Sequence, residues 1–275
     1  MYSVSPEAGA HWRQLLTAVI ARTPHPMTVI EHASPRPLEE LWARTDQGAV
    51  FMCGLPYSLA RPPPALIAAP VPSPAEFGDQ PRYWSDFVVR ADSRFHSIAD
   101  TFGGRIAFTV PESQSGCAAA LTYFMTAVVD GGSDRGAPLF AEIVAPTITP
   151  LGALNAVVLG AADVAPLDAY ALRLLQKFRP DLASQVRIVG KTAATPIPPL
   201  VASRPDLGAL RDGFVHAGDD PALRPLLDAL LLQRFAPPQA VAYDGLRVAF
   251  EASRQYWRAH RLAEVTHPAF ATNFR

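Results

Sequence analysis

The sequence predicts an α/β protein. Short stretches rich in β-branched and aromatic residues alternate with helical patterns along the 275 residues. This alternation is typical of a mostly parallel sheet covered by helices on both faces. Neither an internal repeat nor an obvious linker divides the chain. If it forms two lobes, we expect it to cross between them near Arg90–Ala91 and near Lys191–Thr192.

Local signals predict the elements in order. Ser5, Pro6 and Glu7 combine a helix cap, a first-turn proline and a first-turn acid, so a helix begins there. Beyond residue 192 the apolar spacing is mainly helical. We expect strands at 27–32, 49–54, 65–71, 83–91, 105–110, 139–145, 162–168 and 186–192, and further helices at 37–45, 97–102, 115–130 and 149–160.

Composition excludes several classes of function. The 24 basic and 25 acidic side chains leave no charge excess that would gather nucleic acid or anionic lipid. No apolar run approaches the roughly 20 residues that a membrane helix needs. The first residues also lack the basic and apolar regions of a signal peptide. Because the chain has no charge excess, a ligand must be held by local groups.

Metal and cofactor motifs are absent from the sequence. Cys53 and Cys117 match neither a metal-ligand spacing nor a C-x-x-C motif, and we expect both to be buried and unpaired. The seven histidines show no ligand spacing, and no glycine-rich nucleotide loop is present. A G-x-S-x-G nucleophile motif is missing too. We expect no cofactor, no metal and no catalytic residue.

A polar loop at the start of one predicted helix is the first candidate site. Ser113, Gln114, Ser115 and Gly116 follow the strand at 105–110. The first N–H groups of a helix have no partner inside it and favour negative charge, so these residues suit an oxyanion. The serine hydroxyls would add donors without adding charge. The alternative is that Ser113 or Ser115 simply caps the helix.

A second helix start resembles the first. Thr149 is the expected cap and Pro150 the first helical residue. Asp168 ends another predicted strand, where its carboxylate either accepts hydrogen bonds from a ligand or caps the next helix. Tyr57 and Tyr83 lie at loop and strand junctions and either cover a ligand or belong to the core.

Six segments together resemble the phosphate/phosphonate-type substrate-binding proteins of ABC importers. They are "MYSVSPEAGAHWRQL", "CGLPY", "YWSDFVVRADS", "GGRIAFTVPESQSGC", "LNAVVLGAADVAPLDAYAL" and "VGKTAATPIPPL". The resemblance implies the two-lobed type 2 periplasmic-binding-protein fold, with hinge crossings between lobes that close on a small ligand. Lobe one would comprise residues 1–90 and 192–275, and lobe two residues 91–191.

The resemblance also implies a function and a site. The protein would be a monomeric, periplasmic solute receptor that binds a small oxyanion, such as phosphate or a phosphonate, and passes it to an ABC permease. The sequence itself leaves a cytoplasmic location open. The ligand-binding residues that we expect are Tyr2, Tyr57, Tyr83, Ser113, Gln114, Ser115, Gly116, Thr149 and Asp168.

This sequence departs from the family pattern at the second helix start. Ile148-Thr149-Pro150 stand where phosphonate binders often carry a Gly-Ser or Gly-His step, so a histidine contact is lost. Met1 and Tyr2 fall where relatives finish their first strand.

Two alternative functions use the same fold. One is an enzyme such as a lyase or transferase with Asp168 as acid or base, and the other is a ligand-sensing module that docks to another protein.

Overall fold

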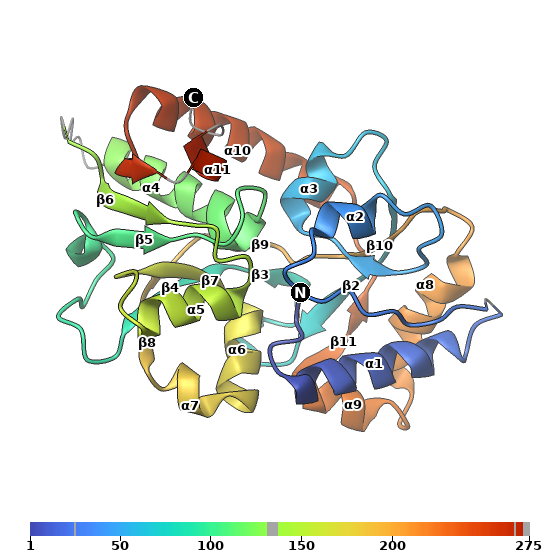
Figure 1. Ribbon diagram of the computed structural model, residues 1–275. Coiled ribbons are helices and arrows are strands. Elements are labelled where there is room, and N and C mark those ends of the chain that lie inside the picture. The colour runs from blue at the N-terminus through green and yellow to red at the C-terminus, as the bar shows by residue number, and fades with distance from the viewer. Residues whose placement is uncertain (25, 131–136, 267, 272–275) are drawn as a thin grey trace. The chain divides into compact units, whose positions relative to one another are not determined.

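We describe the protein from a computed structural model (Figure 1) that covers residues 1–275 apart from 25, 131–136, 267 and 272–275. Its contacts divide the chain into two compact units. Unit 1 comprises Met1–Tyr83 and Thr195–Asp244, and unit 2 comprises Trp84–Ala194 and Gly245–Arg275. The chain therefore passes between the units three times, once within helix α10 (Val241–Ala259).

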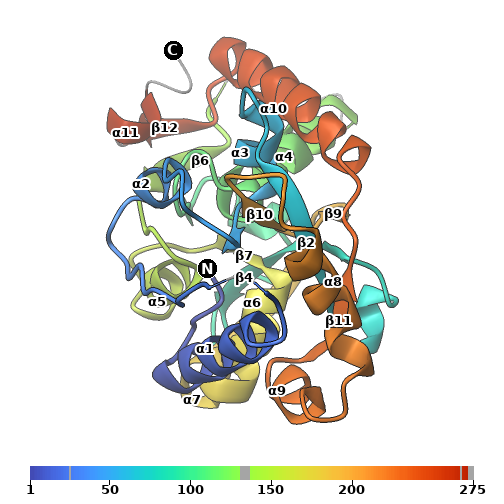
Figure 2. The same ribbon diagram turned by 90° about the vertical axis from the view of Figure 1, so that its right-hand side faces the viewer.

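Unit 1 begins with helix α1 (Pro6–Ile20). Ser5 caps it by accepting a hydrogen bond from the Ala8 N–H at 3.1 Å. Its buried face, with Trp12 and Leu15 at helical spacing, packs beside α8 (Gly208–Val215) and α9 (Arg224–Ala229), as Figure 2 shows. Two shorter helices, α2 (Leu38–Trp42) and α3 (Gly54–Leu59), complete the N-terminal half of the unit.

The unit 1 sheet is antiparallel throughout its four strands, in the order β1-β10-β2-β11. Segments far apart in the sequence pair within it, for example Leu66 with Val201. A separate two-stranded pair joins β3 to β9. The strand bounds are β1 Val50–Phe51, β2 Ala65–Pro72, β3 Arg82–Tyr83, β9 Thr195–Pro196, β10 Leu200–Ala202 and β11 Leu232–Ala236.

The unit 2 strands run in the order β12-β6-β5 and β7-β4-β8, and a parallel bridge between Ile106 and Val164 connects the two groups. β6 pairs in parallel with β5 and β12, whereas β4 is antiparallel to β7 and β8. The bounds are β4 Ser85–Arg90, β5 Arg105–Ala107, β6 Phe140–Val144, β7 Ala165–Asp168, β8 Val186–Lys191 and β12 Ala263–Thr266.

Helices cover both faces of the unit 2 sheet. Neighbouring residues of a strand point to opposite faces: Asp86 of β4 binds Arg173 of α6 (Ala169–Phe178), whereas Phe87 packs 5.3 Å from Phe124 of α4 (Ala119–Asp130). The remaining helices are α5 (Pro150–Val158), α7 (Pro180–Ala183) and α11 (Pro268–Ala271).

Two sequence expectations about the elements were wrong: the strand at 27–32 and the predominance of parallel pairing. Residues 27–32 form no strand, because no other strand pairs with them and Ile30 stays 53 % exposed. Beyond residue 192 the described chain is mainly helical, as predicted, but four short strands, β9 to β12, lie between the helices. Antiparallel pairs outnumber parallel ones, because distant segments pair with β2 and β4 in place of successive strand–helix–strand units.

The lobe assignment of the C-terminal residues also needs correction. We expected all of residues 192–275 in lobe one, but residues from Gly245 onward pack in unit 2. The Trp257 indole donates to the Leu121 carbonyl at 3.0 Å, and Phe270 stacks on Phe108 with ring centroids 5.9 Å apart. These buried aromatic contacts and the β12–β6 pairing hold the C-terminal segment to unit 2.

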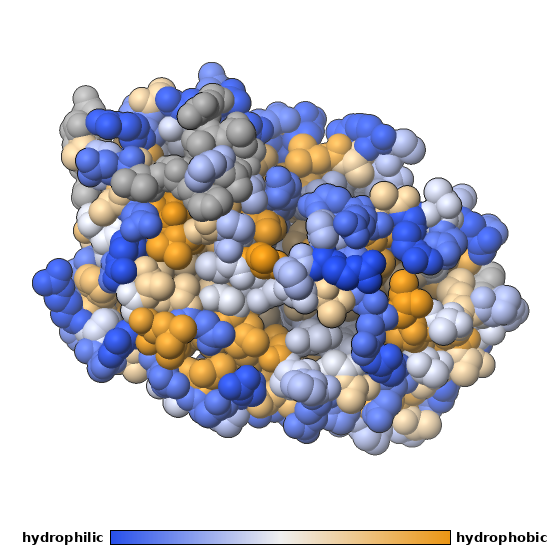
Figure 3. All heavy atoms as spheres, in the orientation of Figure 1, coloured by the Kyte–Doolittle hydropathy of each residue, from blue (hydrophilic) through white to orange (hydrophobic). Residues whose placement is uncertain are grey.

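The surface shown in Figure 3 mixes polar and apolar residues. Single apolar side chains remain exposed, such as Leu159 at 80 % and Val241 at 69 %. Among the described helices, none has the length and apolar character needed to cross a membrane.

Candidate functional site

Buried polar side chains gather at one edge of the unit 2 sheet. β5 and β7 run in parallel, while β4 runs the other way. The carboxyl ends of β5 and β7 therefore meet the beginning of β4 and the end of β8 at the same edge. We call six residues at this edge and its loops the polar edge: Ser85, Thr109, Gln114, Ser115, Asp168 and Thr192, all at most 8 % exposed.

The start of α4 is built on this edge. After β5 the chain forms a single π-helical turn (Gln114–Ala118) that continues into α4. Ser113 caps the turn, because its Oγ accepts from the Gly116 N–H at 3.0 Å and its carbonyl accepts from the Ala118 N–H at 3.0 Å. The Ser113 hydroxyl still has its own proton to donate. The capping alternative is thus correct for Ser113, and it leaves a role in ligand binding open.

Hydrogen bonds fix this turn to the strands. The Ser85 hydroxyl donates to the Ser115 carbonyl at 2.7 Å, and the Thr109 N–H donates to the Gly116 carbonyl at 3.2 Å. A Cβ at Gly116 would collide with the Thr109 side chain, so glycine is required for this close approach. The helix start is therefore held rigidly against β4 and the loop after β5.

The start of α5 is tied to the same loop. Thr149 caps α5 by accepting from the Gly152 N–H at 3.0 Å, and Pro150 is the first helical residue. Just before the cap, the Thr147 N–H and hydroxyl both donate to the Phe108 carbonyl at 3.0 Å. The Ile148 N–H donates to the Thr109 carbonyl at 3.3 Å. Residues 108–109 thus bring the two expected helix starts together.

Asp168 is the last residue of β7 and the cap of α6. Its Oδ1 accepts from the Ala171 N–H at 2.9 Å, so the capping alternative is correct here too. A carboxylate at a helix N-terminus is stabilised by the macrodipole. Burial, and secondarily the Asp168 charge, raise the pKa of the buried Tyr170 hydroxyl two positions further on.

All three expected tyrosines belong to unit 1, whereas the residues of the polar edge belong to unit 2. Tyr2 is 2 % exposed and contacts the ring of Phe51 edge-on at 5.3 Å. Tyr57 of α3 contacts Tyr243 of α10 at 5.0 Å, and burial followed by the Asp244 charge raises the pKa of Tyr57. Tyr83 of β3 is fully buried.

Sequence reasoning missed three members of the polar edge: Ser85, Thr109 and Thr192. Thr192 Oγ1 accepts from the Ser85 N–H at 3.0 Å, and the Ser85 carbonyl accepts from the Thr192 N–H at 3.0 Å. Each of the three is a hydroxyl residue within two positions of a strand end. These hydroxyl residues are visible in the sequence, but they predict a shared edge only when the strand order is known.

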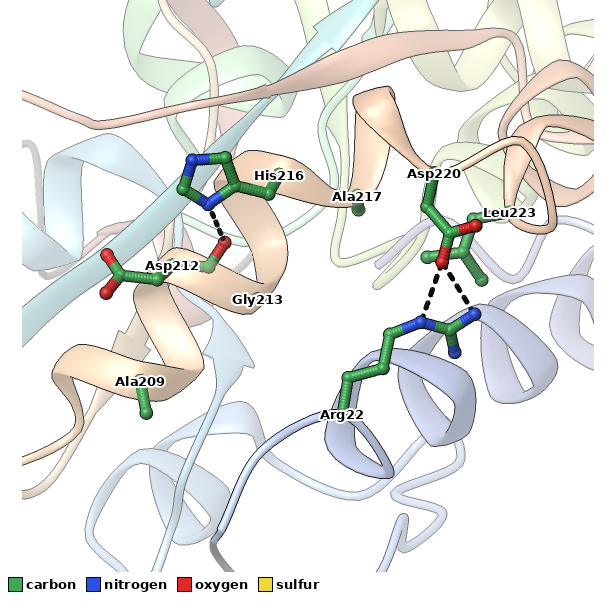
Figure 4. Close-up of a pocket in the computed structure, with 8 residues that line it drawn as sticks. All are labelled: Arg22, Ala209, Asp212, Gly213, His216, Ala217, Asp220 and Leu223. Atoms are coloured by element: carbon green, nitrogen blue, oxygen red, sulfur yellow. Dashed lines mark hydrogen bonds and ion pairs between the residues drawn. The ribbon is translucent and has the colours of Figure 1, made fainter.

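A hollow of about 380 Å³ on unit 1 is a weaker candidate (Figure 4). Its Arg22 guanidinium pairs with the Asp220 carboxylate at 2.6 Å, and His216 Nδ1 lies 2.9 Å from the Asp212 carbonyl. Because the Arg22 and Asp220 charges of this hollow already pair with each other, we regard it as a weaker candidate than the polar edge. The lining residues are Arg22, Ala209, Asp212, Gly213, His216, Ala217, Asp220 and Leu223.

The described residues contain no group of three or more His, Cys, Asp or Glu side chains that could hold a metal ion. Cys117 lies in the π-helical turn, but burial, and secondarily the Glu112 charge, raise the pKa of its thiol. A thiol held neutral is a poor nucleophile. The polar edge offers hydroxyl, amide and carboxylate groups for hydrogen bonding.

Comparison with solved structures supports the fold. A binding-protein component of an ABC phosphonate transporter from Pseudomonas aeruginosa matches with a TM-score of 0.74 and 18 % identity, over 98 % of this chain and 89 % of the other. PhnD1 from Prochlorococcus marinus, solved with methylphosphonate, matches with a TM-score of 0.67 and 17 % identity, over 91 % and 93 %. A Xanthomonas citri protein bound to ATP matches with a TM-score of 0.60 and 20 % identity, over 90 % and 95 %.

No curated protein matches the chain. The family model described as "ABC transporter, phosphonate, periplasmic substrate-binding protein" matches residues 6–243. The match covers well over half of the sequence. The protein therefore belongs to the family of periplasmic substrate-binding proteins of phosphonate ABC transporters, which is a transport family and not a family of enzymes.

Proposed function

We propose that this protein is a non-enzymatic, monomeric receptor that binds a small phosphonate or similar oxyanion in the periplasm and passes it to an ABC permease. The observation that carries the proposal is the convergence of the α4 and α5 starts on residues 108–109. Two helix N-termini at one place favour negative charge without any cationic side chain. This suits a chain of formal net charge −1.

The proposed contacts divide by chemistry. Ser113, Ser115 and Thr149 supply hydroxyl donors to the anionic oxygens. Asp168 would accept from a hydroxyl or amino substituent of the ligand, because a carboxylate only accepts hydrogen bonds. Tyr2, Tyr57 and Tyr83 remain proposed contacts that cover the ligand with their rings, as the sequence resemblance implies.

A thermal-shift panel tests the ligand class. Phosphate, phosphite, methylphosphonate and methanesulfonate are each added at increasing concentration. A ligand at a hundredfold excess over its Kd stabilises the folded protein by about 2.7 kcal/mol. We expect phosphonates to raise the Tm. An unchanged Tm with every oxyanion would contradict the proposal.

A double variant tests the site. Ser113→Ala/Ser115→Ala should lower the affinity for a confirmed ligand by at least about tenfold, because hydrogen bonds to charged groups contribute ~1.5–3 kcal/mol. Ser184→Ala, at an exposed position of the same unit, is the matched control. Affinity equal to the wild type in the double variant would show that α4 does not hold the ligand.

A further inference from the structure

Two buried oxygen atoms near the start of α4 have no hydrogen-bond partner among the described residues: Thr109 Oγ1 and Gln114 Oε1. Each residue is only 4 % exposed. Burial of a polar atom without a partner is costly, and native proteins pair nearly all such atoms. Two orphaned oxygens beside one helical turn indicate that a group from outside the chain pairs with them.

The positions of these oxygens point to the proposed ligand site. The Thr109 side chain occupies the space that a Cβ at Gly116 would need. Its hydroxyl therefore faces the turn that begins α4. Gln114 is the first residue of that π-helical turn, and such turns often occur at functional sites. This inference therefore rests on the proposed function and concerns the same site.

The chemistry of the two groups differs from that of the serines. An amide oxygen accepts hydrogen bonds and cannot donate, whereas a threonine hydroxyl does either. A fully ionised oxyanion offers acceptors alone, so it cannot pair with Gln114 Oε1 in the amide orientation that the structure has. A monoprotonated phosphonate carries one P–OH group, which donates to that oxygen while its other oxygens accept from the hydroxyls and the helix N–H groups.

We propose that Gln114 Oε1 and the Thr109 hydroxyl make the site selective for an oxyanion that carries its own proton donor. The favoured ligand is the monoprotonated form of a phosphonate. The dianion lacks this donor, and so does a sulfonate of similar size. Thr109 is thus a specificity-determining residue alongside Gln114.

Calorimetric titration with methylphosphonate across a range of pH tests this selectivity. The range brackets the second ionisation, which for phosphate esters lies near about pH 6. Above that ionisation the competent form declines, so the measured affinity should fall about tenfold per pH unit. Methanesulfonate should bind at least about tenfold more weakly than monoprotonated methylphosphonate.

Variants separate a ligand contact from a structural role. Thr109→Val removes the hydroxyl at nearly constant volume. We expect an affinity loss of at least about tenfold with no fall in the Tm of the ligand-free protein, because no partner in the described structure is lost. Thr101→Val is the matched control: its buried hydroxyl donates to the Ile98 carbonyl at 2.6 Å, so the Tm should fall while affinity stays unchanged.

Gln114→Met separates ligand protonation from general effects of pH on the protein. It removes the acceptor, so the pH dependence of methylphosphonate affinity should flatten. Affinity that is constant or rises with pH in the wild type would overturn the inference, as would equal binding of methanesulfonate. Those results leave phosphonate binding itself intact. Absence of phosphonate binding at every pH would contradict the proposed function, and this inference with it.

Discussion

Units 1 and 2 bury different kinds of side chain. Every buried Ser, Thr, Asp or Gln among the described residues lies in unit 2, and the buried residues of unit 1 are apolar or aromatic, including Tyr2, Tyr57, Tyr83 and Tyr243. An apolar interior is stabilised by burial alone. Buried polar groups must be paired to avoid a loss of stability. The difference agrees with the proposal that unit 2 supplies the oxyanion contacts, and it makes the stability of unit 2 depend more on internal polar pairing.

The largest expected effect comes from breaking the ion pair between the buried Asp86 and the largely buried Arg173 of unit 2. Asp86, 2 % exposed, accepts from Arg173 at 3.0 Å and from the Trp84 indole at 2.8 Å. Asp86→Ala leaves the Arg173 guanidinium, whose side chain is only 14 % exposed, without this carboxylate, and should lower the free energy of unfolding by about 3 kcal/mol in urea.

The control for that variant is an ion pair on the surface of unit 1. Asp228 lies four residues after Arg224, with its side chain 64 % exposed. Asp228→Ala should lower the free energy of unfolding by less than about 1 kcal/mol. Equal effects of the Asp86 and Asp228 variants would remove the energetic contrast between the units.

A second pair of variants compares hydroxyl groups from the two units. Ser113→Gly keeps the helix cap to within a few tenths of a kcal/mol, so a change in affinity reports the lost hydroxyl. We expect methylphosphonate to bind about 10- to 100-fold more weakly. Tyr57→Phe should change affinity by less than about threefold, because the Asp244 charge near the Tyr57 hydroxyl disfavours an anion there.

Calorimetric titration of both variants provides the measurement. A larger loss in Tyr57→Phe than in Ser113→Gly would reverse the assignment and move the main anion contact to unit 1. The same experiment tests whether the Tyr57 hydroxyl, as distinct from its ring, contacts the ligand.

A smaller effect concerns alkaline pH. Burial raises the pKa of Tyr243, whose hydroxyl donates to the Ile197 carbonyl at 3.0 Å. An unfolded tyrosine ionises near pH ~10, so above that pH unfolding releases a proton and stability falls as pH rises.

Tyr243→Phe should cost about 1 kcal/mol at neutral pH, through the lost hydrogen bond. Above about pH 10 its stability should decline less steeply than that of the wild type, by up to ~1.4 kcal/mol per pH unit. Urea unfolding at neutral and alkaline pH measures both quantities. Tyr170→Phe should flatten the alkaline decline similarly, because burial raises the pKa of Tyr170 in unit 2 as well. Parallel slopes for wild type and variants would contradict the pKa directions.

Helix starts could be predicted from the sequence because their causes are local. Ser5 precedes the first residue of α1 and Thr149 precedes that of α5, and both make the expected capping hydrogen bonds. A cap side chain bonds an N–H group three residues away, so a window of a few residues contains the necessary information.

The short strands and the complete polar edge could not be predicted in this way. β10 has three residues, and its Val201 pairs with Leu66, more than a hundred positions earlier. Ser85 and Thr109 are unremarkable in sequence. They become neighbours of the α4 start only because β4, β5 and β7 lie side by side, which depends on long-range packing.

Hydrogen–deuterium exchange with and without methylphosphonate tests the central claim most directly, because it locates binding by segment. We predict that a saturating ligand slows exchange most strongly at backbone amides of residues 109–118 and 149–153, where the two helix starts converge. If methylphosphonate binds but leaves exchange at both segments unchanged, the anion is held elsewhere and the assignment of the site to unit 2 is contradicted.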